Sequence, residues 1–269
     1  MKPTALVCHK CTVEKRFRYP NTLPVWLQTA LGKSLIQAEY ECLQPMLAGL
    51  FGPVAVQIGE AGICSFVEFS HAAFCYTASM DLDRHQGHEA ANLYCIPEQL
   101  PFEAKSVGLV ILPHVLEFSD YPHQILREVE RILMPEGNLV VLGFNPLSLW
   151  GLTSLFRRNR MPWNGRFSTL GRIKDWLALL NFELTAGKMI YHKPPIQSET
   201  VRGRLDFLER AGDRWWPLGA AVYAVVARKR EIGVTPLHPQ WKRERRLNPG
   251  LAKPIANARC ASCGRYKPG

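Results

Sequence analysis

One stretch decides the fold: residues 126–141 read LREVERILMPEGNLVV. Apolar residues at three- and four-residue spacing in and beside this stretch predict an amphipathic helix. Its buried side consists of Ile125, Leu126, Val129, Ile132 and Leu133. Asp120 suits the N-cap, Pro122 suits the first turn, and the turn Pro135-Glu136-Gly137 ends the helix. The run 139–144 then predicts a buried strand, so the stretch encodes a helix, a turn and a strand in succession.

Short apolar runs alternate with helical patterns on both sides of this unit. The other runs that predict strands are 54–58, 73–79, 92–96, 107–112, 182–190 and 219–227. Helical spacing covers 24–51, where Gly32 separates two helices, and then 168–180 and 201–208. Strands that alternate with helices predict an α/β fold with a mainly parallel sheet and helices on both of its faces.

Composition and charge divide the chain into three segments. The 269 residues are 47% hydrophobic and 21% charged, as in ordinary globular proteins, and no apolar run is long enough to span a membrane. We expect an N-terminal extension at 1–22, one α/β domain at 23–230, and a basic, disordered tail at 231–269. The N-terminus does not resemble a secretory signal, which predicts a cytoplasmic protein.

The tail carries most of the net charge of +10. Its cluster Lys242-Arg243-Glu244-Arg245-Arg246 lies beside Trp241 and suits an anionic partner such as nucleic acid or an acidic membrane surface. A solvated tail without a partner explains the same cluster equally well.

Two C-x-x-C pairs lie near the two ends of the sequence, Cys8 with Cys11 and Cys260 with Cys263. This is the spacing of zinc-binding pairs, and two pairs would complete a site of four thiolates. The whole α/β domain separates them, however, so free thiols are the simpler interpretation and we predict no metal site.

The sequence around the first stretch resembles a known family. Glu98-Gln99-Leu100-Pro101-Phe102 precedes the run 107–112, and His114-Val115-Leu116-Glu117-Phe118 leads from that run to 126–141. This series resembles class I methyltransferases that use S-adenosylmethionine (SAM), in particular the type 11 group related to quinone-biosynthesis methyltransferases. The resemblance implies a Rossmann-like fold with seven strands, the last of them antiparallel. It also implies transfer of a methyl group from SAM to an apolar or aromatic small molecule.

The resemblance further implies where SAM would bind. In the family, a glycine-rich loop follows the first strand with a helix N-terminus beside it, an acidic residue after the second strand holds the ribose, and residues after the third contact the adenine. Carried onto this sequence, the cofactor contacts are Gln57, Gly59, Ala61, Gly62, Asp81 (or Asp83), Ile96 and Pro97.

Several of these positions depart from the family pattern. Gln57 and Ile96 stand where the family has acidic residues, and Ala61 stands where it has a glycine. Loss of several charge-assisted hydrogen bonds would remove micromolar affinity for the cofactor. The alternative function is therefore a catalytically inactive relative that binds or scaffolds, with nucleic acid contacted through the basic tail.

His114 and Glu117 follow the run 107–112, where the substrate pocket of the family begins. His114 is the candidate catalytic residue, because an imidazole in that place can accept a proton from a substrate. A histidine that packs or hydrogen-bonds at the end of the strand is the alternative.

The segment 145–156 is rich in Leu, Trp and Phe and is followed by Arg157, Arg158 and Arg160. It predicts a lid over an apolar substrate, or a basic amphipathic element that touches a membrane surface. A helix that packs on the sheet, with solvated arginines at its end, is the alternative.

Overall fold

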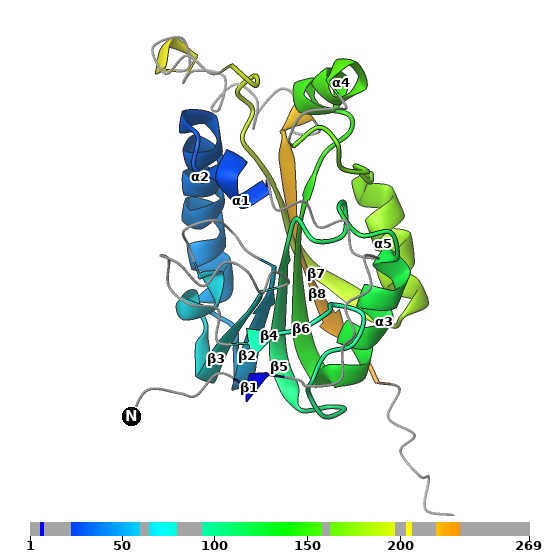
Figure 1. The fold of residues 1–269 in the computed structure, drawn as a ribbon. Helices are drawn as coiled ribbons and strands as arrows, with labels where there is room; N and C mark the ends of the chain where they lie inside the picture. Colours follow the sequence, from blue (N-terminus) through cyan, green and yellow to red (C-terminus); the bar gives the residue numbers. More distant parts are fainter. Residues whose placement is uncertain are drawn as a thin grey trace, which may run out of the picture. The chain divides into compact units, whose positions relative to one another are not determined.

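The computed structural model describes residues 6–7, 23–59, 65–79, 93–157, 162–196, 203–205 and 219–231. The helices of these residues are α1 (Leu23–Leu27), α2 (Ala30–Leu47), the 3-10 helix η1 (Phe66–Phe69), α3 (Pro122–Ile132), α4 (Leu149–Phe156) and α5 (Leu170–Leu179). The strands are β1 (Leu6–Val7), β2 (Phe51–Ile58), β3 (His71–Ser79), β4 (Leu93–Tyr94), β5 (Val107–Pro113), β6 (Leu133–Phe144), β7 (Phe182–Ile190) and β8 (Val222–Lys229). Figure 1 shows the strands side by side with helices on both sides of them.

The described strands form one sheet in the order β1-β4-β3-β2-β5-β6-β8-β7. The strands from β1 to β6 in this order are parallel, and β8 is antiparallel to both of its neighbours. The strands β2 to β8 are the seven of the predicted α/β sheet, and the last is antiparallel as expected. β1 is an addition, because Leu6 pairs with Leu93 from a segment that the sequence indicated only as an extension.

Each face of the sheet has its own apolar core, since alternate residues of a strand point to opposite faces. One core joins α1, α2 and η1 to the face that carries Ala55 and Leu109. The other core joins α3 and α5 to the face that carries Val56 and Val110. In Figure 1, α2 lies on one side of the strands while α3 and α5 lie on the other. The prediction of helices on both faces is confirmed.

The two N-terminal helices separate earlier than the sequence indicated. α1 ends at Leu27, and the hydroxyl of Thr29 caps α2 by accepting the N–H of Gly32 at 3.2 Å. Gly32 thus lies in the first turn of α2 instead of between the helices. A Cβ at Gly32 would lie 2.5 Å from the Cα of Leu27, so glycine is required by the close approach of the two helices.

β2 begins at Phe51, so Gly52 and Pro53, expected to precede the strand, belong to it. A Cβ on Gly52 would lie 3.0 Å from the Cα of Gly108 in β5, so glycines allow these two backbones to approach. Pro53 precedes the positions where β2 pairs with β5, which begin at Ala55. A proline near the start of a strand is compatible with a sheet because it removes no central ladder bond.

Smaller boundary differences occur around the helices. The N-cap of α3 is Tyr121, one residue after the predicted Asp120, and the N-cap of α5 is Thr169, one residue after Ser168, where the sequence predicts that this helix begins. β6 starts directly after α3, so the turn at 135–137 lies inside the strand. The helix expected at 201–208 lies mostly outside the described residues.

The connection between β2 and β3 differs most from the expectation. Only residues 59–70 join these strands, and the described part of the connection contains a single 3-10 turn, η1. The resemblance implied a helix here, with its N-terminus beside the cofactor. α2 packs against η1 on this face, where the rings of Tyr40 and Phe69 meet at 4.4 Å. Among the described residues, no helix is long and apolar enough to cross a membrane.

Candidate functional site

The predicted site lies at the edge of the sheet where the parallel strands end. β2 ends at Ile58, β5 at Pro113 and β6 at Phe144, and the loops that follow leave the same edge. Open parallel sheets bind ligands at this edge. The predicted residues found there are Gln57, Gly59, Ile96, Pro97 and His114. The others, Ala61, Gly62, Asp81 and its alternative Asp83, lie outside the described residues, as do Cys8, Cys11, Cys260 and Cys263.

Gln57 holds the loop after β2 with both ends of its side-chain amide. Its Oε1 accepts the N–H of Phe66 at 2.8 Å, and its Nε2 donates to the carbonyl of Gly59 at 3.3 Å. Gly59 has a φ of 95°, a conformation that favours glycine, and its N–H donates to the carbonyl of Ala78 at 2.9 Å. The buried amide of Gln57 therefore joins the two ends of the segment 59–66. Both of its polar atoms are used in these hydrogen bonds.

The loop after β4 brings an acidic side chain to this edge, two residues beyond Ile96. Ile96 bridges to Gln99 and Pro97 is buried. Both carboxyl oxygens of Glu98 are buried, and neither has a hydrogen-bond partner within the described part of the chain. Desolvation raises the pKa of Glu98, while its own N–H and the nearby hydroxyl of Ser119 act in the opposite direction. A buried carboxyl group with unused acceptors suits a ligand that donates an N–H.

His114 lies in a buried cluster of charged side chains directly after β5. Its Nε2 is 2.8 Å from Oε1 of Glu39 in α2, and its Nδ1 is 3.7 Å from Oε2 of Glu117, which is longer than a hydrogen bond. The other oxygen of Glu117 accepts the N–H of Phe144. His114 and Glu117 are each 3% exposed, and Glu39 is 1% exposed. The cluster therefore connects α2, the loop after β5 and the end of β6.

The cluster fixes the protonation state of His114. Burial alone would disfavour the charged imidazolium, but the carboxylates of Glu39 and Glu117 outweigh it and raise the pKa of His114 to about 10. The residue has a φ of 52°, its N–H donates to Leu142 at 3.1 Å, and its ring stacks on Phe144 with centroids 4.2 Å apart. A histidine that keeps its proton at neutral pH cannot accept one from a substrate. Proton acceptance by His114 would require it first to lose the proton that its neighbouring carboxylates stabilise, and its catalytic role stays a prediction.

The apolar segment after β6 forms α4, which has one buried side and one exposed side. Trp150 donates its indole N–H to the carbonyl of Lys193 at 2.9 Å and packs against Trp26 and Phe144. Several other apolar side chains of the segment are exposed. They are Leu147, Leu149, Leu152, Leu155 and Phe156. The lid expected from the sequence is thus a helix anchored through Trp150, with its remaining apolar side chains facing outward.

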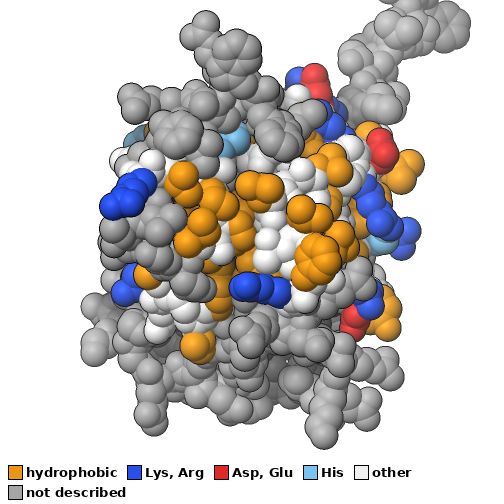
Figure 2. All heavy atoms as spheres, turned by 90° about the horizontal axis from the view of Figure 1, so that it is seen from above, with side chains coloured by type: hydrophobic (Ala, Val, Ile, Leu, Met, Phe, Trp, Pro, Cys, Tyr) orange, Lys and Arg blue, Asp and Glu red, His pale blue; other side chains and the backbone are white. Residues whose placement is uncertain are grey.

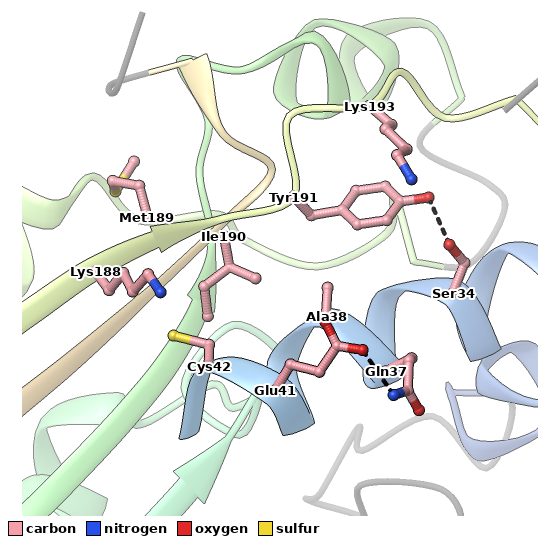
Figure 3. A pocket seen from close by; sticks show the side chains of 10 residues that line it. All are labelled: Ser34, Gln37, Ala38, Glu41, Cys42, Lys188, Met189, Ile190, Tyr191 and Lys193. Carbon is pink, nitrogen blue, oxygen red and sulfur yellow. Dashed lines mark hydrogen bonds between the residues drawn. The ribbon is translucent and has the colours of Figure 1, made fainter. Parts of the chain in front are cut away.

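A separate groove of about 410 Å³ lies between α2 and the end of β7. Figure 3 shows side chains from both elements facing it, with the hydroxyls of Ser34 and Tyr191 joined by a hydrogen bond of 3.1 Å. The lining combines charged groups, such as Glu41 and Lys188, with apolar ones such as Ile190. None of the predicted site residues lines this groove.

Two residues of the edge were missed by sequence reasoning. Glu39 interrupts an apolar stripe of α2 between Leu35 and Leu43, and an acid at such a position signals a buried partner. Glu98 was considered only as part of the motif 98–102. The signal that could have identified it is Ile96, an apolar residue where the family has an acid, because Glu98 is the nearest acidic residue to that position. Among the described residues, no cluster of His, Cys, Asp and Glu could hold a metal ion.

Comparison with known proteins agrees with this architecture. The methyltransferase domain family matches residues 68–141. The uncharacterized protein YafS of Escherichia coli is 34% identical over 178 residues, which are 63% of this chain and 70% of the relative. A demethylmenaquinone methyltransferase of Chlamydia pneumoniae is 33% identical over 72 residues, which are 25% of this chain and 31% of that enzyme.

A solved structure supports the same assignment at the level of fold. The SAM-dependent methyltransferase from Mesorhizobium loti superposes with a TM-score of 0.51 at 16% identity, over 71% of this chain and 98% of the other. The chain therefore belongs to the methyltransferase domain family, and its fold is that of class I SAM-dependent methyltransferases. By family it is a methyltransferase, and its methyl acceptor is a separate question.

Proposed function

We propose that this protein transfers the methyl group of SAM to an apolar or aromatic small molecule at the C-terminal edge of its sheet. The observation that carries the proposal is the carboxyl group of Glu98. Both of its oxygens are buried and have no close hydrogen-bond partner among the described residues, and only the Ser119 hydroxyl and its own N–H lie near enough to lower its pKa. It lies in the loop after β4, where the family is expected to contact the adenine. A carboxyl group that loses hydration, and whose oxygens have no close partner among the described residues, is typical of a binding site.

The residues at this edge fit SAM by means that differ partly from those of the family. Glu98 would accept the adenine amino group in place of the missing acid at Ile96, and Pro97 would offer apolar surface to the ring. The backbone at Gly59 would approach the cofactor without a Cβ in the way. Gln57 would act indirectly, because it holds the carbonyl of Gly59 and the N–H of Phe66. Asp81 remains the candidate for the ribose hydroxyls.

His114 would position the loop on the acceptor side instead of moving a proton. SAM, when bound, supplies a methyl group on an already activated sulfonium, so alignment matters more than a general base. The protonated His114, held by Glu39 and Glu117, fixes the backbone after β5 in a left-handed conformation. A fixed loop keeps the acceptor in line for the displacement.

The rings at this edge support an apolar or aromatic acceptor. Phe144 stacks on His114, and the ring of Phe167 stacks on Phe144 with centroids 5.0 Å apart. Trp150 and Trp163 extend the cluster at 5.3 Å. Phe144, Trp150 and Trp163 are buried in the core, so within this cluster the partly exposed ring of Phe167 is the one that offers apolar surface to a ring-shaped ligand. The acceptor in the name of the Chlamydia relative, demethylmenaquinone, belongs to the same chemical class.

A catalytically inactive relative is the second candidate, and one observation favours it. The connection after β2 is too short for the usual helix, and its described part holds only the 3-10 turn η1. A helix N-terminus is a ready-made site for a negatively charged group, and the described residues of this connection do not supply one. The inactive protein would keep the fold as a binding or scaffolding module.

Calorimetry distinguishes the two candidates. We expect S-adenosylhomocysteine and SAM to bind the full chain, and Glu98→Gln to weaken both by tenfold or more, since a hydrogen bond to a charged group contributes about 1.5–3 kcal/mol. Glu103→Gln, an exposed acid five residues further on, is the matched control and should bind normally.

The results distinguish a wrong role for Glu98 from a wrong function for the protein. If neither nucleoside binds folded wild-type protein, the inactive module is favoured. If both bind and Glu98→Gln changes nothing, the role of Glu98 is wrong while the activity stands. Transfer of labelled methyl from SAM into an organic extract of cell lipids and small molecules then tests the acceptor class.

A further inference from the structure

We propose that the outer face of α4 docks the protein on an anionic lipid surface. The face consists of five exposed apolar side chains, Leu147, Leu149, Leu152, Leu155 and Phe156, which we call the α4 patch. They are between 45% and 82% exposed. Within α4, the exposed residues recur at three- and four-residue spacing, so they share one side of the helix.

The α4 patch stands on a rigid base. The hydroxyl of Ser148 accepts the N–H of Gly151 at 3.1 Å and donates to the carbonyl of Asn145 at 2.7 Å, which caps the helix. A Cβ on Gly151 would lie 2.0 Å from the carbonyl oxygen of Pro146, so the helix is folded tightly onto the preceding turn. Trp150 anchors the other side of the helix in the core. Exposure of the patch therefore does not result from a loose helix.

The basic residues around α4 favour an anionic lipid surface as the binding partner of the α4 patch. Between Glu136 and Asp175 the sequence contains no acidic residue. The same stretch contains the basic residues Arg157, Arg158, Arg160, Arg166, Arg172 and Lys174. Figure 2 looks onto this end of the molecule and shows hydrophobic side chains gathered together with Lys and Arg side chains beside them. An apolar face next to basic side chains is the pattern of helices that lie in a membrane interface.

The same basic residues disfavour a dimer in which a second copy of this chain covers the α4 patch. Two copies meeting through α4 would bring together their basic stretches, which contain six Lys and Arg and no acidic residue between Glu136 and Asp175. A lipid surface of opposite charge accepts both features at once, because acyl chains receive the leucines while headgroups receive the arginines. α4 also follows β6 at the edge where the candidate site lies. Docking through it would therefore bring that edge near the lipid.

Vesicle flotation with the full chain tests the proposal. We expect the protein to float with vesicles that contain phosphatidylglycerol, and to bind vesicles of pure phosphatidylcholine more weakly. The triple variant Leu152→Ser, Leu155→Ser and Phe156→Ser should lose about tenfold or more in partition on anionic vesicles, since each side chain contributes apolar area. Arg157→Glu should weaken binding to the anionic vesicles alone.

An exposed leucine outside the α4 patch, Leu179, provides the control. Leu179→Ser removes an equally exposed leucine, 80% exposed at the end of α5, and should bind vesicles like the wild type. The proposal is overturned if wild-type protein does not float or if the triple variant floats equally well. Light scattering that shows a dimer lost in the triple variant would assign the patch to a second copy instead. If the wild type binds no vesicles and the triple variant unfolds at a lower temperature, the α4 patch packs against another part of this chain and the proposal is wrong.

The proposal does not rest on the proposed function. The triple variant should bind S-adenosylhomocysteine like the wild type, because none of its three residues belongs to the candidate site. Failure of lipid docking and failure of cofactor binding are therefore separate results.

Discussion

The loops after β2 and β5 leave neighbouring strands at the same edge of the sheet, yet they are held by different chemistry. A neutral amide, that of Gln57, holds the loop after β2 through two hydrogen bonds. The loop after β5 is held by an imidazolium, that of His114, between the carboxylates of Glu39 and Glu117. Neutral hydrogen bonds contribute about 1 kcal/mol each, whereas breaking a buried ion pair costs about 3–5 kcal/mol.

The difference teaches how the two halves of the candidate site divide their roles. Under the proposed function, the strongly fixed loop after β5 would lie on the acceptor side, where alignment governs methyl transfer. The weakly fixed loop after β2 would lie on the cofactor side, where this sequence departs from the family pattern at Gln57, Ala61 and Ile96. A site that changes on one side and keeps its geometry on the other can alter how it holds a cofactor without losing the position of the acceptor.

Removal of Glu39 should produce the largest effect. Glu39→Ala leaves the buried imidazolium without its nearest partner, and we expect a loss of about 3–5 kcal/mol in the free energy of unfolding. Chemical denaturation at neutral pH measures it. Glu41→Ala, two residues further on the exposed side of α2, is the matched control and should change stability by about 0.5 kcal/mol or less. Equal effects of the two variants would mean that the charged cluster does not fix the loop after β5.

Removal of the amide of Gln57 should have a smaller effect. Gln57→Ala leaves the buried N–H of Phe66 without an acceptor, and we expect a loss of about 1–3 kcal/mol. Gln37→Ala removes an amide that is bonded on the exposed side of α2, and should be nearly neutral. Gln57→Glu restores the acid of the family but sets a carboxylate against the carbonyl of Gly59, so it should also destabilise. A neutral Gln57→Ala would show that the loop after β2 is held elsewhere.

The stability of the protein should depend on pH through the loop after β5, which contains the charged His114, and not through the loop after β2, which is held by the neutral amide of Gln57. The pKa of His114 is raised from 6.5 to about 10, so between these values the folded protein holds a proton that the unfolded chain has lost. The stabilisation is complete below pH 6.5 and is lost as the pH rises towards 10, with a slope of about 1.4 kcal/mol per pH unit. Denaturation curves at several pH values across this window measure the slope, and His123→Gln serves as control. A stability that stays level or rises with pH would contradict the assigned charge.

The unit β5–α3–β6 could be predicted from the sequence because its signals are local. The apolar stripe of α3, the proline of its first turn and the buried strands all lie within a few residues of one another. The bounds of β7 were predicted as the structure has them for the same reason. Local periodicity is sufficient when each element buries a continuous face.

The contacts of the site could not be predicted in the same way, since they join distant segments. Glu39 and His114 are 75 residues apart, and no periodic pattern relates them. The break between α1 and α2 depends on a capping hydroxyl and on close helix approach at Gly32, whereas the sequence showed only a glycine. The short connection between β2 and β3 was open to prediction, because residues 59–70 are too few for a glycine-rich loop and several helical turns, and the described part of it holds only the 3-10 turn η1.

The smallest effect should come from Glu98, and its sign differs from the others. Burial raises the pKa of this carboxyl group, so its ionised form opposes folding at neutral pH. Glu98→Gln removes that penalty and should stabilise the protein by about 0.5 kcal/mol or less, while affinity for S-adenosylhomocysteine falls. Thermal unfolding and calorimetry on the same samples measure both, with Glu103→Gln as the unaffected reference. A group that opposes folding yet favours the ligand is retained for binding, whereas loss of stability with unchanged affinity would place Glu98 among the structural acids of the sheet edge.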